Sequence, residues 1–146
     1  LPAGFATAVY GILDGNSGEF VYSSAGHIPP LHYHAGTATV TRLKSGLGLP
    51  LGMFETGMHG HYRESQVSLE EGDVLLLYTD GIIEVHDDND EMFGMDGLEG
   101  LVERKLSENG ELVLDLLYQD VLDMTGKSTI PDDVVLMAIR YRRRRS

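Results

Sequence analysis

The sequence predicts an α+β domain in which helices pack on a mainly antiparallel sheet, and three observations lead to this fold class. The N-terminal half consists of short β-rich segments separated by turn-forming residues. The unbroken apolar run at 74–78 has the length and composition of a strand that is covered on both faces. Two segments with helical apolar spacing then precede a last β-rich segment at 134–141.

The β-rich segments of the N-terminal half are expected to pair as hairpins. Their turns contain the glycine, asparagine and aspartate that tolerate left-handed backbone geometry. The predicted hairpins are 5–13 with 20–23 around the turn 14–18, and 31–34 with 38–43 around 35–37. Residues 45–52, rich in glycine, proline and leucine, are predicted to form a loop.

Two helices are expected between the apolar run and the last strand. Asp96 is the predicted N-cap of the first, with Glu99 three residues later in a capping-box pattern. Its apolar face is formed by Leu98, Leu101, Val102 and Leu106. The second helix is predicted over about 111–124, with Gly126 beyond its end. Its apolar stripe is predicted to contain Val113, Leu117, Val121 and Met124.

Length and composition favour one globular domain over the whole chain. The 146 residues, of which 42% are hydrophobic, are enough to bury a core, and we expect a single domain at 1–146 with a basic tail at 140–146. No apolar run approaches the roughly 18–20 residues of a membrane span. Because there is no cysteine, disulfides and thiolate metal sites are excluded. This composition is compatible with a cytoplasmic location.

Charge is distributed unevenly along the chain. The formal net charge is −12, although five of the eleven basic residues are arginines in the last seven positions. The other 139 residues hold six basic and 23 acidic side chains, a formal charge of −17. Such a body repels nucleic-acid phosphates and attracts cations, so no nucleic-acid partner is expected. We interpret the arginine tail as a solvated terminus, with a small anion-binding arm as the alternative.

Carboxylates at two strand ends are the main candidates for chemistry. Asp80 directly follows the buried run, where a carboxylate is costly unless it is paired or bound to a cation. Asp132 and Asp133 precede the last strand, and adjacent carboxylates favour a site where a cation or solvent screens them. Oxygen ligands of this kind suit Mg²⁺ and Mn²⁺. The alternative for Asp80 is a role in a turn or as a helix cap, and the alternative for Asp132 and Asp133 is a polar loop before the last strand.

Other candidates are weaker. His27 could act as an acid or a ligand, but after small residues it more often fixes a loop by hydrogen bonds. The remaining histidines, at 32, 34, 59, 61 and 86, have no zinc-like spacing on a helix. The acidic run 84–96 has no glycine where a calcium loop needs one, so we interpret it as a flexible acidic flap beside Asp80. Motifs for nucleotide binding or a serine nucleophile are absent.

Several segments, taken in the order in which they occur along the chain, resemble the SpoIIE/RsbU branch of the PPM (type 2C) metal-dependent serine/threonine protein phosphatases. The resemblance covers nearly the whole chain, and the ordered set is more specific than any single motif. It rests on these segments: Phe-Ala-Thr-Ala-Val-Tyr (5–10), Ser-Ala-Gly-His-Ile-Pro-Pro-Leu (24–31), Gly-Leu-Pro-Leu-Gly (48–52), Leu-Glu-Glu-Gly-Asp (69–73), Leu-Tyr-Thr-Asp-Gly-Ile-Ile-Glu (77–84), Glu-Met-Phe-Gly (91–94) and Asp-Asp-Val-Val-Leu (132–136).

The resemblance implies a fold and a set of metal ligands. The fold is an αββα sandwich with a two-metal site at one edge of the sheets, here lacking its N-terminal strands and helices. Asp80 is similar to the metal-binding aspartate of the family's Thr-Asp-Gly motif. Asp132 is similar to the first residue of its closing Asp-Asp, which ranks it above Asp133 as a ligand. His27 resembles the histidine of Ala-Gly-His, to which we assign a structural role.

The chain also departs from the family pattern. The family's Gly-Gly-Asp and Asp-Val-Ser-Gly segments, which supply the aspartate that bridges both metals, are absent. The chain is therefore expected to be the last three-fifths or so of a catalytic domain, with little activity by itself. Val85-His86-Asp87 stands where the family more often has Ala-Arg-Asn, and Val135 where it has threonine. Neither change removes a ligand.

The implied function is hydrolysis of phosphoserine or phosphothreonine by water that two Mn²⁺ or Mg²⁺ ions activate. By analogy the substrate is a regulatory protein of the anti-anti-sigma factor type, and a sensor or receiver domain is expected upstream. The alternative is a non-catalytic pseudophosphatase or adaptor that binds a sigma-factor regulator. The residues before Leu1 would discriminate between them. A homodimer through exposed apolar sheet surface is a third hypothesis.

Overall fold

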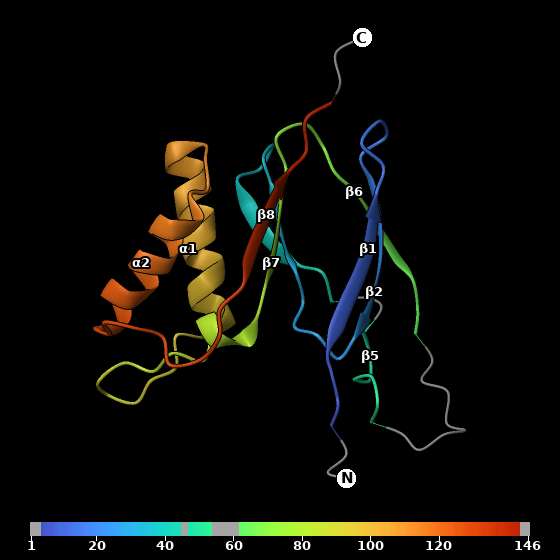
Figure 1. Ribbon diagram of the computed structural model, residues 1–146. Coiled ribbons are helices and arrows are strands. Elements are labelled where there is room, and N and C mark those ends of the chain that lie inside the picture. The colour runs from blue at the N-terminus through green and yellow to red at the C-terminus, as the bar shows by residue number, and fades with distance from the viewer. Residues whose placement is uncertain (1–3, 45–46, 54–61, 144–146) are drawn as a thin grey trace.

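The computed structural model describes residues 4–44, 47–53 and 62–143. Two helices, one sheet and a second sheet lie side by side as successive layers (Figure 1). In chain order the elements of this part are β1 (Ala8–Leu13), β2 (Glu19–Ala25), β3 (Leu31–His34), β4 (Thr39–Arg42), β5 (Leu47–Gly48), β6 (Ser65–Ser68), β7 (Val74–Tyr78), the 3₁₀ helix η1 (Asp80–Ile82), α1 (Gly94–Asn109), α2 (Leu114–Thr125) and β8 (Leu136–Arg140).

The strands form two four-stranded sheets. In the first, β2 pairs with β1 along one edge, and with β6 and β5 along the other. The second has the order β4-β3-β7-β8, with every pair antiparallel. Both predicted hairpins are confirmed, as β1–β2 and β3–β4. The mainly antiparallel α+β class is therefore confirmed.

Strand β7 lies between two cores, as its unbroken apolar sequence predicts. Val74, Leu76 and Tyr78 pack in the core that the second sheet shares with the helices. Leu75 faces the other way, into the core between the two sheets, where it meets aromatic residues such as Phe20 and Tyr22. Leu75 is 0% exposed, so the strand is covered on both faces.

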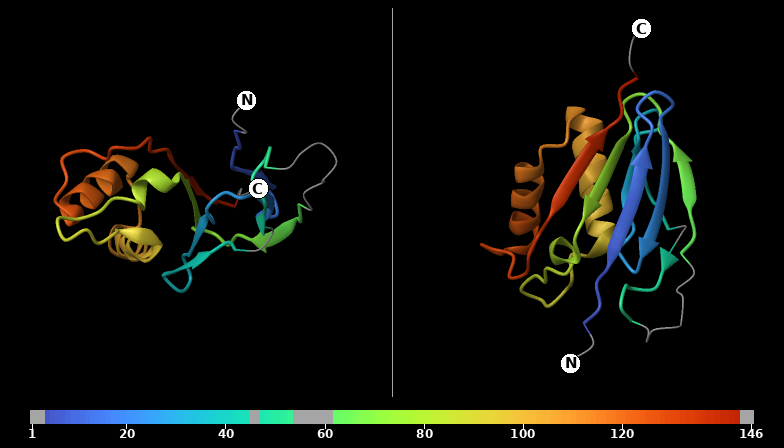
Figure 2. Two further views of the ribbon diagram at one scale, coloured as in Figure 1. Left: turned by 90° about the horizontal axis from the view of Figure 1, so that it is seen from below. Right: turned by 45° about the vertical axis from the view of Figure 1, so that its right-hand side comes forward.

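The helices cover only the second sheet. Figure 2, seen from below, shows α1 and α2 on the side of that sheet away from the first one. In the part of the chain that the structure describes, the outer face of the first sheet carries no helix. The arrangement is thus the α-β-β part of the expected αββα sandwich. No helix among the described residues is long and apolar enough to cross a membrane.

Helix α1 differs from its prediction at the N-terminus. The four predicted apolar side chains are all buried, but the helix begins at Gly94, so Asp96 lies inside the first turn and Phe93 is the N-cap. The capping-box prediction is therefore wrong. Asp96 and Glu99 instead pair with the guanidinium of Arg42 on β4. Arg42 lies more than 50 residues away in the sequence, and its guanidinium pairs with both carboxylates that the capping-box pattern assigned to the end of the helix.

Helix α2 also departs from the prediction. It begins at Leu114, and its predicted apolar stripe is only half right, since Leu117 and Val121 are buried while Val113 and Met124 are exposed. Leu122 and Thr125 complete the buried face. Thr125 can be buried because its hydroxyl donates to backbone carbonyls of the preceding turn. Gly126 ends the helix in the left-handed conformation, as predicted.

One of the two predicted loops contains a short strand, whereas the other is a loop as expected. Residues 47–48, predicted as loop, form β5 and pair in parallel with Ser24 and Ala25 at the end of β2. The acidic run does form a loop beside Asp80, and the Asp87 carboxylate accepts N–H groups of Asn89 and Glu91 within it. Of the basic tail, Arg144 and Arg145 lie outside the described residues.

A buried hydrogen-bonded pair links β3 to the start of β7. His32 and Asp73 are each 2% exposed, and their Nε2 and Oδ2 atoms are 2.8 Å apart. Burial lowers the pKa of His32 and outweighs the opposing influence of Asp73. Burial acts to raise the pKa of Asp73, but N–H donors of Ala35 and Glu70 and the His32 ring hold it below its ordinary value. A neutral His32 therefore donates to an ionised Asp73.

Candidate metal centre

Three carboxylates converge where β7 ends and β8 begins. Asp80, Glu84 and Asp132 each place a carboxylate oxygen within 4.8 Å of the others, and all three side chains are exposed. The two aspartates singled out in the sequence thus lie together, although 52 positions separate them. Asp133 is not part of this group.

The end of β7 turns sharply and brings Glu84 back beside Asp80. After Tyr78 the chain enters η1, whose first residue is Asp80. The N–H groups of Ile83 and Glu84 both donate to the Asp80 carbonyl, each at 3.0 Å. This helix-like turn puts side chains four residues apart on the same side, so Glu84 lies near Asp80.

Thr79 fastens the segment that carries Asp132. Its hydroxyl donates to the Asp133 carbonyl at 3.2 Å and accepts the Val135 N–H at 2.9 Å. Its own N–H donates to the Val135 carbonyl at 3.1 Å. These three bonds hold residues 133–135 against the end of β7, so the position of Asp132 next to Asp80 follows from Thr79.

Gly81 lets this segment approach the turn closely. A Cβ atom built at Gly81 would lie 2.6 Å from the Asp133 carbonyl oxygen, which is closer than any side chain allows. The close approach brings the Asp132 side of the loop over η1. In the Thr-Asp-Gly motif, the first residue fastens the loop, the second supplies a carboxylate and the third leaves room for the loop.

His27 connects the two sheets behind Asp80. Its Nε2 donates to the Tyr78 carbonyl at 3.0 Å, and its Nδ1 is 3.3 Å from the hydroxyl of Thr7. Gly26 has a positive φ of 66° and its Cα approaches the Pro50 ring closely, so a side chain there would clash. These contacts are those of a residue that fixes a loop, and they support the structural role assigned to His27.

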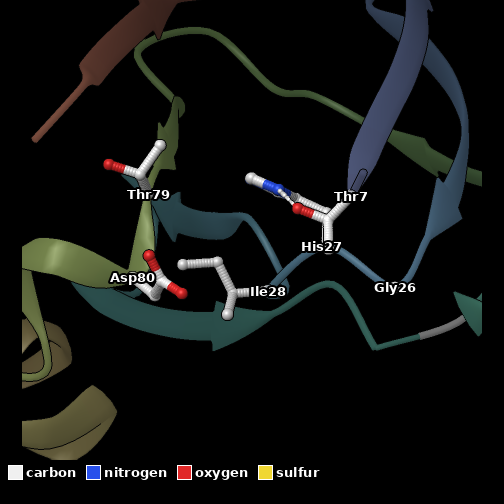
Figure 3. Close-up of a pocket in the computed structure, with 6 residues that line it drawn as sticks. All are labelled: Thr7, Gly26, His27, Ile28, Thr79 and Asp80. Atoms are coloured by element: carbon white, nitrogen blue, oxygen red, sulfur yellow. Dashed lines mark hydrogen bonds between the residues drawn. The ribbon is translucent and has the colours of Figure 1, made fainter. Parts of the chain in front are cut away.

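A small cavity of about 90 Å³ lies between the sheets at this point. Figure 3 shows its lining, with Asp80 at one side and the hydrogen-bonded Thr7 and His27 at the other. The lining residues are Thr7, Gly26, His27, Ile28, Thr79 and Asp80. Of the three carboxylates, Asp80 is the one that lines this cavity.

The donor set fits a hard divalent cation. Three carboxylates this close repel one another, and a cation between them removes that repulsion. Their oxygens, with water in the remaining positions, are the ligands that Mg²⁺ and Mn²⁺ prefer. The exposure of all three side chains leaves room for those waters and for a substrate. The residues present therefore fit the metal that the sequence resemblance implies.

Sequence reasoning missed two contributors to this site. Both the acidic run and the resemblance segment 77–84 include Glu84, but neither assigns it a ligand role, although its spacing of four from Asp80 is a helical signal. Thr79 belongs to the Thr-Asp-Gly motif, but the role of its hydroxyl could not be predicted, because its partner lies 54 residues away. Two histidines, His59 and His61, lie outside the described residues, and the Nδ1 atom of exposed His86 bonds the Glu84 carbonyl.

Comparison with known proteins places this chain in a class of protein phosphatases. The family described as Stage II sporulation protein E (SpoIIE) matches residues 2–142. The chain therefore belongs to the SpoIIE family of PPM-type serine/threonine phosphatase domains.

Two curated proteins are similar in sequence to nearly all of this chain. Protein IcfG of Synechocystis sp. is 28% identical over 135 residues, which are 92% of this chain and 20% of that protein. The phosphoserine phosphatase RsbU of Bacillus subtilis is 27% identical over 136 residues, 93% of this chain and 39% of that protein. The chain thus spans well under half the length of both relatives.

Solved structures agree with the fold. The structure of the RsbU and RsbW domains of Rv1364c from Mycobacterium tuberculosis has a TM-score of 0.70 and 33% identity, covering 93% of this chain and 36% of that one. The phosphatase domain of SpoIIE from Bacillus subtilis, in a manganese-presoaked form, has a TM-score of 0.65 and 18% identity, covering 96% and 58%. The second likeness concerns the fold alone.

Proposed function

We propose that this chain carries metal ligands of a phosphatase that hydrolyses phosphoserine or phosphothreonine on a regulatory protein. The convergence of Asp80, Glu84 and Asp132 in a SpoIIE-family chain carries this proposal. The chemistry supplied by two bound Mn²⁺ or Mg²⁺ ions is activation of a water molecule and neutralisation of charge on the phosphoryl group. Asp80 and Asp132 are the proposed ligands from the resemblance, and Glu84 is added from the geometry.

The other residues of the site hold these ligands in place. Thr79 and Gly81 fix the distance between the two loops, so the carboxylates are arranged before any ion binds. His27 keeps the end of β7 against the first sheet. Pre-arrangement lowers the entropy cost of gathering ligands and so strengthens binding.

The proposed substrate is a phosphorylated protein of the anti-anti-sigma factor type. An exposed site at a sheet edge is accessible to a phosphorylated side chain on another protein surface. The family relationship with RsbU, a phosphoserine phosphatase, supports a phosphoserine substrate. A sensor or receiver domain before the phosphatase part is proposed on the same analogy.

Removal of one ligand tests the proposal. In a protein that carries this chain together with the preceding family segments, Asp80→Asn should lower Mn²⁺-dependent phosphate release from a phosphoserine peptide by several orders of magnitude, because charge and ligation are both lost. Asp115→Asn, an exposed carboxylate at the start of α2, serves as the matched control. A near-wild-type rate for Asp80→Asn would remove Asp80 from the site.

The 146-residue chain alone should release little phosphate, because the family's bridging aspartate is absent from it. Strong Mn²⁺-dependent turnover by this chain would contradict that expectation. If the longer protein also lacks activity but binds a sigma-factor regulator, the adaptor alternative is the correct one.

A further inference from the structure

A second group of metal-binding side chains lies at the other end of β7. Asp73 directly precedes this strand, whereas Asp80 follows it, so the two groups are separated by the length of β7. One ligand atom each of His32, His34 and Asp73 lies within 4.8 Å of the others. We propose that these three residues form a separate site for a transition-metal ion such as Zn²⁺.

The β-strand explains why the two histidines lie together. Residues two apart on a strand point to the same face, so His32 and His34 of β3 project together. Their ring centroids are 3.9 Å apart, and Asp73 directly precedes β7, the strand that pairs with β3. The sequence contains no zinc-like spacing on a helix, but a His-x-His pair on a strand gives the same convergence.

Outer hydrogen bonds hold two of the three ligands, Asp73 and His34, in the way that metal ligands are usually held. The Asp73 carboxylate accepts the Ala35 N–H at 2.8 Å and the Glu70 N–H at 3.0 Å. The His34 Nε2 lies 2.8 Å from the hydroxyl of Thr41. Such outer hydrogen bonds orient imidazole and carboxylate ligands and strengthen metal binding.

The donor set distinguishes this group from the carboxylate group at the other end of β7. Two imidazoles and one carboxylate suit Zn²⁺, Co²⁺ or Ni²⁺, whereas Mg²⁺ and Mn²⁺ favour oxygen ligands. Three protein ligands leave the fourth tetrahedral position to water. His34 is half-buried and gives access from solvent, while His32 and Asp73 are fully buried.

Binding requires a small rearrangement and a change of the His32 tautomer. Tetrahedral Zn²⁺ holds its ligand atoms about 3.3 Å apart, so the His34 ring moves inward and the 2.8 Å His32–Asp73 separation opens slightly. The ion takes the place of the hydrogen between Nε2 and the carboxylate. Neutral His32 carries its one ring proton on Nε2, so this proton moves to Nδ1 when the ion binds, and the ring stays neutral with no net proton released.

Co²⁺ titration of the 146-residue chain tests the proposal, with visible absorption as the readout. Tetrahedral Co²⁺ with imidazole ligands absorbs far more strongly than Co²⁺ in an octahedral oxygen site. We expect an intense band that saturates at one ion and that Zn²⁺ displaces. His34→Gln should weaken binding at least about tenfold. Asp80→Asn should leave the band unchanged, which separates this site from the proposed phosphatase site.

Imidazole ¹⁵N NMR of the wild-type chain keeps the test valid if a variant fails to fold. Zn²⁺ should shift ring nitrogens of His32 and His34 and leave those of exposed His86 in place. The proposal is overturned if no intense Co²⁺ band forms, if His34→Gln retains it, or if Zn²⁺ leaves the His32 and His34 nitrogens unchanged.

Discussion

At the scale of single residues, each of the three residues of the Thr-Asp-Gly segment has a separate role. Asp80 supplies a carboxylate to the candidate metal centre, while Thr79 bonds the backbone of residues 133–135. Gly81 permits the backbone of Asp133 to approach within a distance that excludes a side chain. The position of Asp132 beside Asp80 therefore depends on bonds that Thr79 makes to the backbone of Asp133 and Val135.

Replacement of Thr79 by valine tests this division. Thr79→Val keeps the shape but removes the hydroxyl, which leaves the Val135 N–H and the Asp133 carbonyl without this partner. We expect a loss of about 1–2 kcal/mol in the free energy of unfolding, measured by urea denaturation. The loosened loop should also weaken Mn²⁺ binding.

Thr37→Val is the matched control for Thr79→Val. Its hydroxyl bonds only that of Thr39, and both are exposed, so the free energy of unfolding should change by less than about 0.5 kcal/mol. Equal effects of the two substitutions would show that the Thr79 hydroxyl does not fasten the loop.

At the scale of elements, β7 organises the domain. It lies in the middle of the second sheet and contributes to both cores. One candidate metal-binding group lies at each end of the strand. Asp73, at its start, fixes the turns at Ala35 and Glu70 and pairs with His32 on β3. The buried pair makes the pairing of β3 with β7 sensitive to acid.

The pKa values of this pair predict how stability varies with pH. The pKa values of His32 and Asp73 are both lowered on folding, so the unfolded chain takes up protons first as pH falls. The stabilisation is complete above the ordinary histidine pKa of 6.5 and decreases below it, with a second decrease from Asp73 below about 3.8. Urea denaturation in the presence of EDTA should show stability falling between pH 7 and pH 5.

A histidine substitution identifies the source of that decrease. His32→Gln retains a donor for Asp73 but does not titrate, so the fall between pH 7 and pH 5 should become shallower. His86→Gln, at an exposed position, should keep the wild-type slope. If both variants retain the wild-type slope, the acid sensitivity arises elsewhere.

Most elements could be predicted from the sequence, because they rest on local patterns. The alternating strands, the apolar face of α1 and the two-sided burial of β7 follow from spacing alone. The capping of α1 could not be predicted, since Arg42 reaches Asp96 and Glu99 from another element. The short strand β5 depends on its pairing with β2 and has no periodic signal of its own.

The candidate metal centre was predictable only in part. Asp80 and Asp132 were identified because each stands at a strand end and matches a family motif. Their proximity could not be established, because it requires β7 and β8 to be neighbours. Glu84 and Thr79 act through a turn and a distant loop, so the local sequence gives no sign of their roles beyond spacing.

At the scale of the whole molecule, one group of exposed apolar side chains lies on the first sheet, away from the candidate metal centre. The candidate metal centre lies at one end of the second sheet, while exposed apolar side chains lie on the outer face of the first. Tyr10 is 72% exposed and Ile12 is 60% exposed on β1, and Leu51 and Tyr62 border a cavity of about 170 Å³ beside them. Apolar surface of this kind favours association.

We therefore expect the 146-residue chain to self-associate as its concentration rises. Light scattering across a dilution series should show a rising average mass, and the double variant Tyr10→Ser, Ile12→Thr should reduce the rise. Met124→Ser removes an exposed apolar side chain from α2 and should leave association unchanged. A constant monomer mass at all concentrations would contradict the homodimer hypothesis.

The central claim is that the carboxylates at the ends of β7 and β8 bind a divalent cation together. Calorimetric titration of the chain with Mn²⁺ tests it most directly when Asp132→Asn is compared with its neighbour Asp133→Asn. The two substitutions change charge equally, but only Asp132 belongs to the group with Asp80 and Glu84. Mn²⁺ affinity should fall at least about tenfold in Asp132→Asn and stay near wild type in Asp133→Asn. Equal affinities in the two variants, or no Mn²⁺ binding by the wild-type chain, would contradict the account.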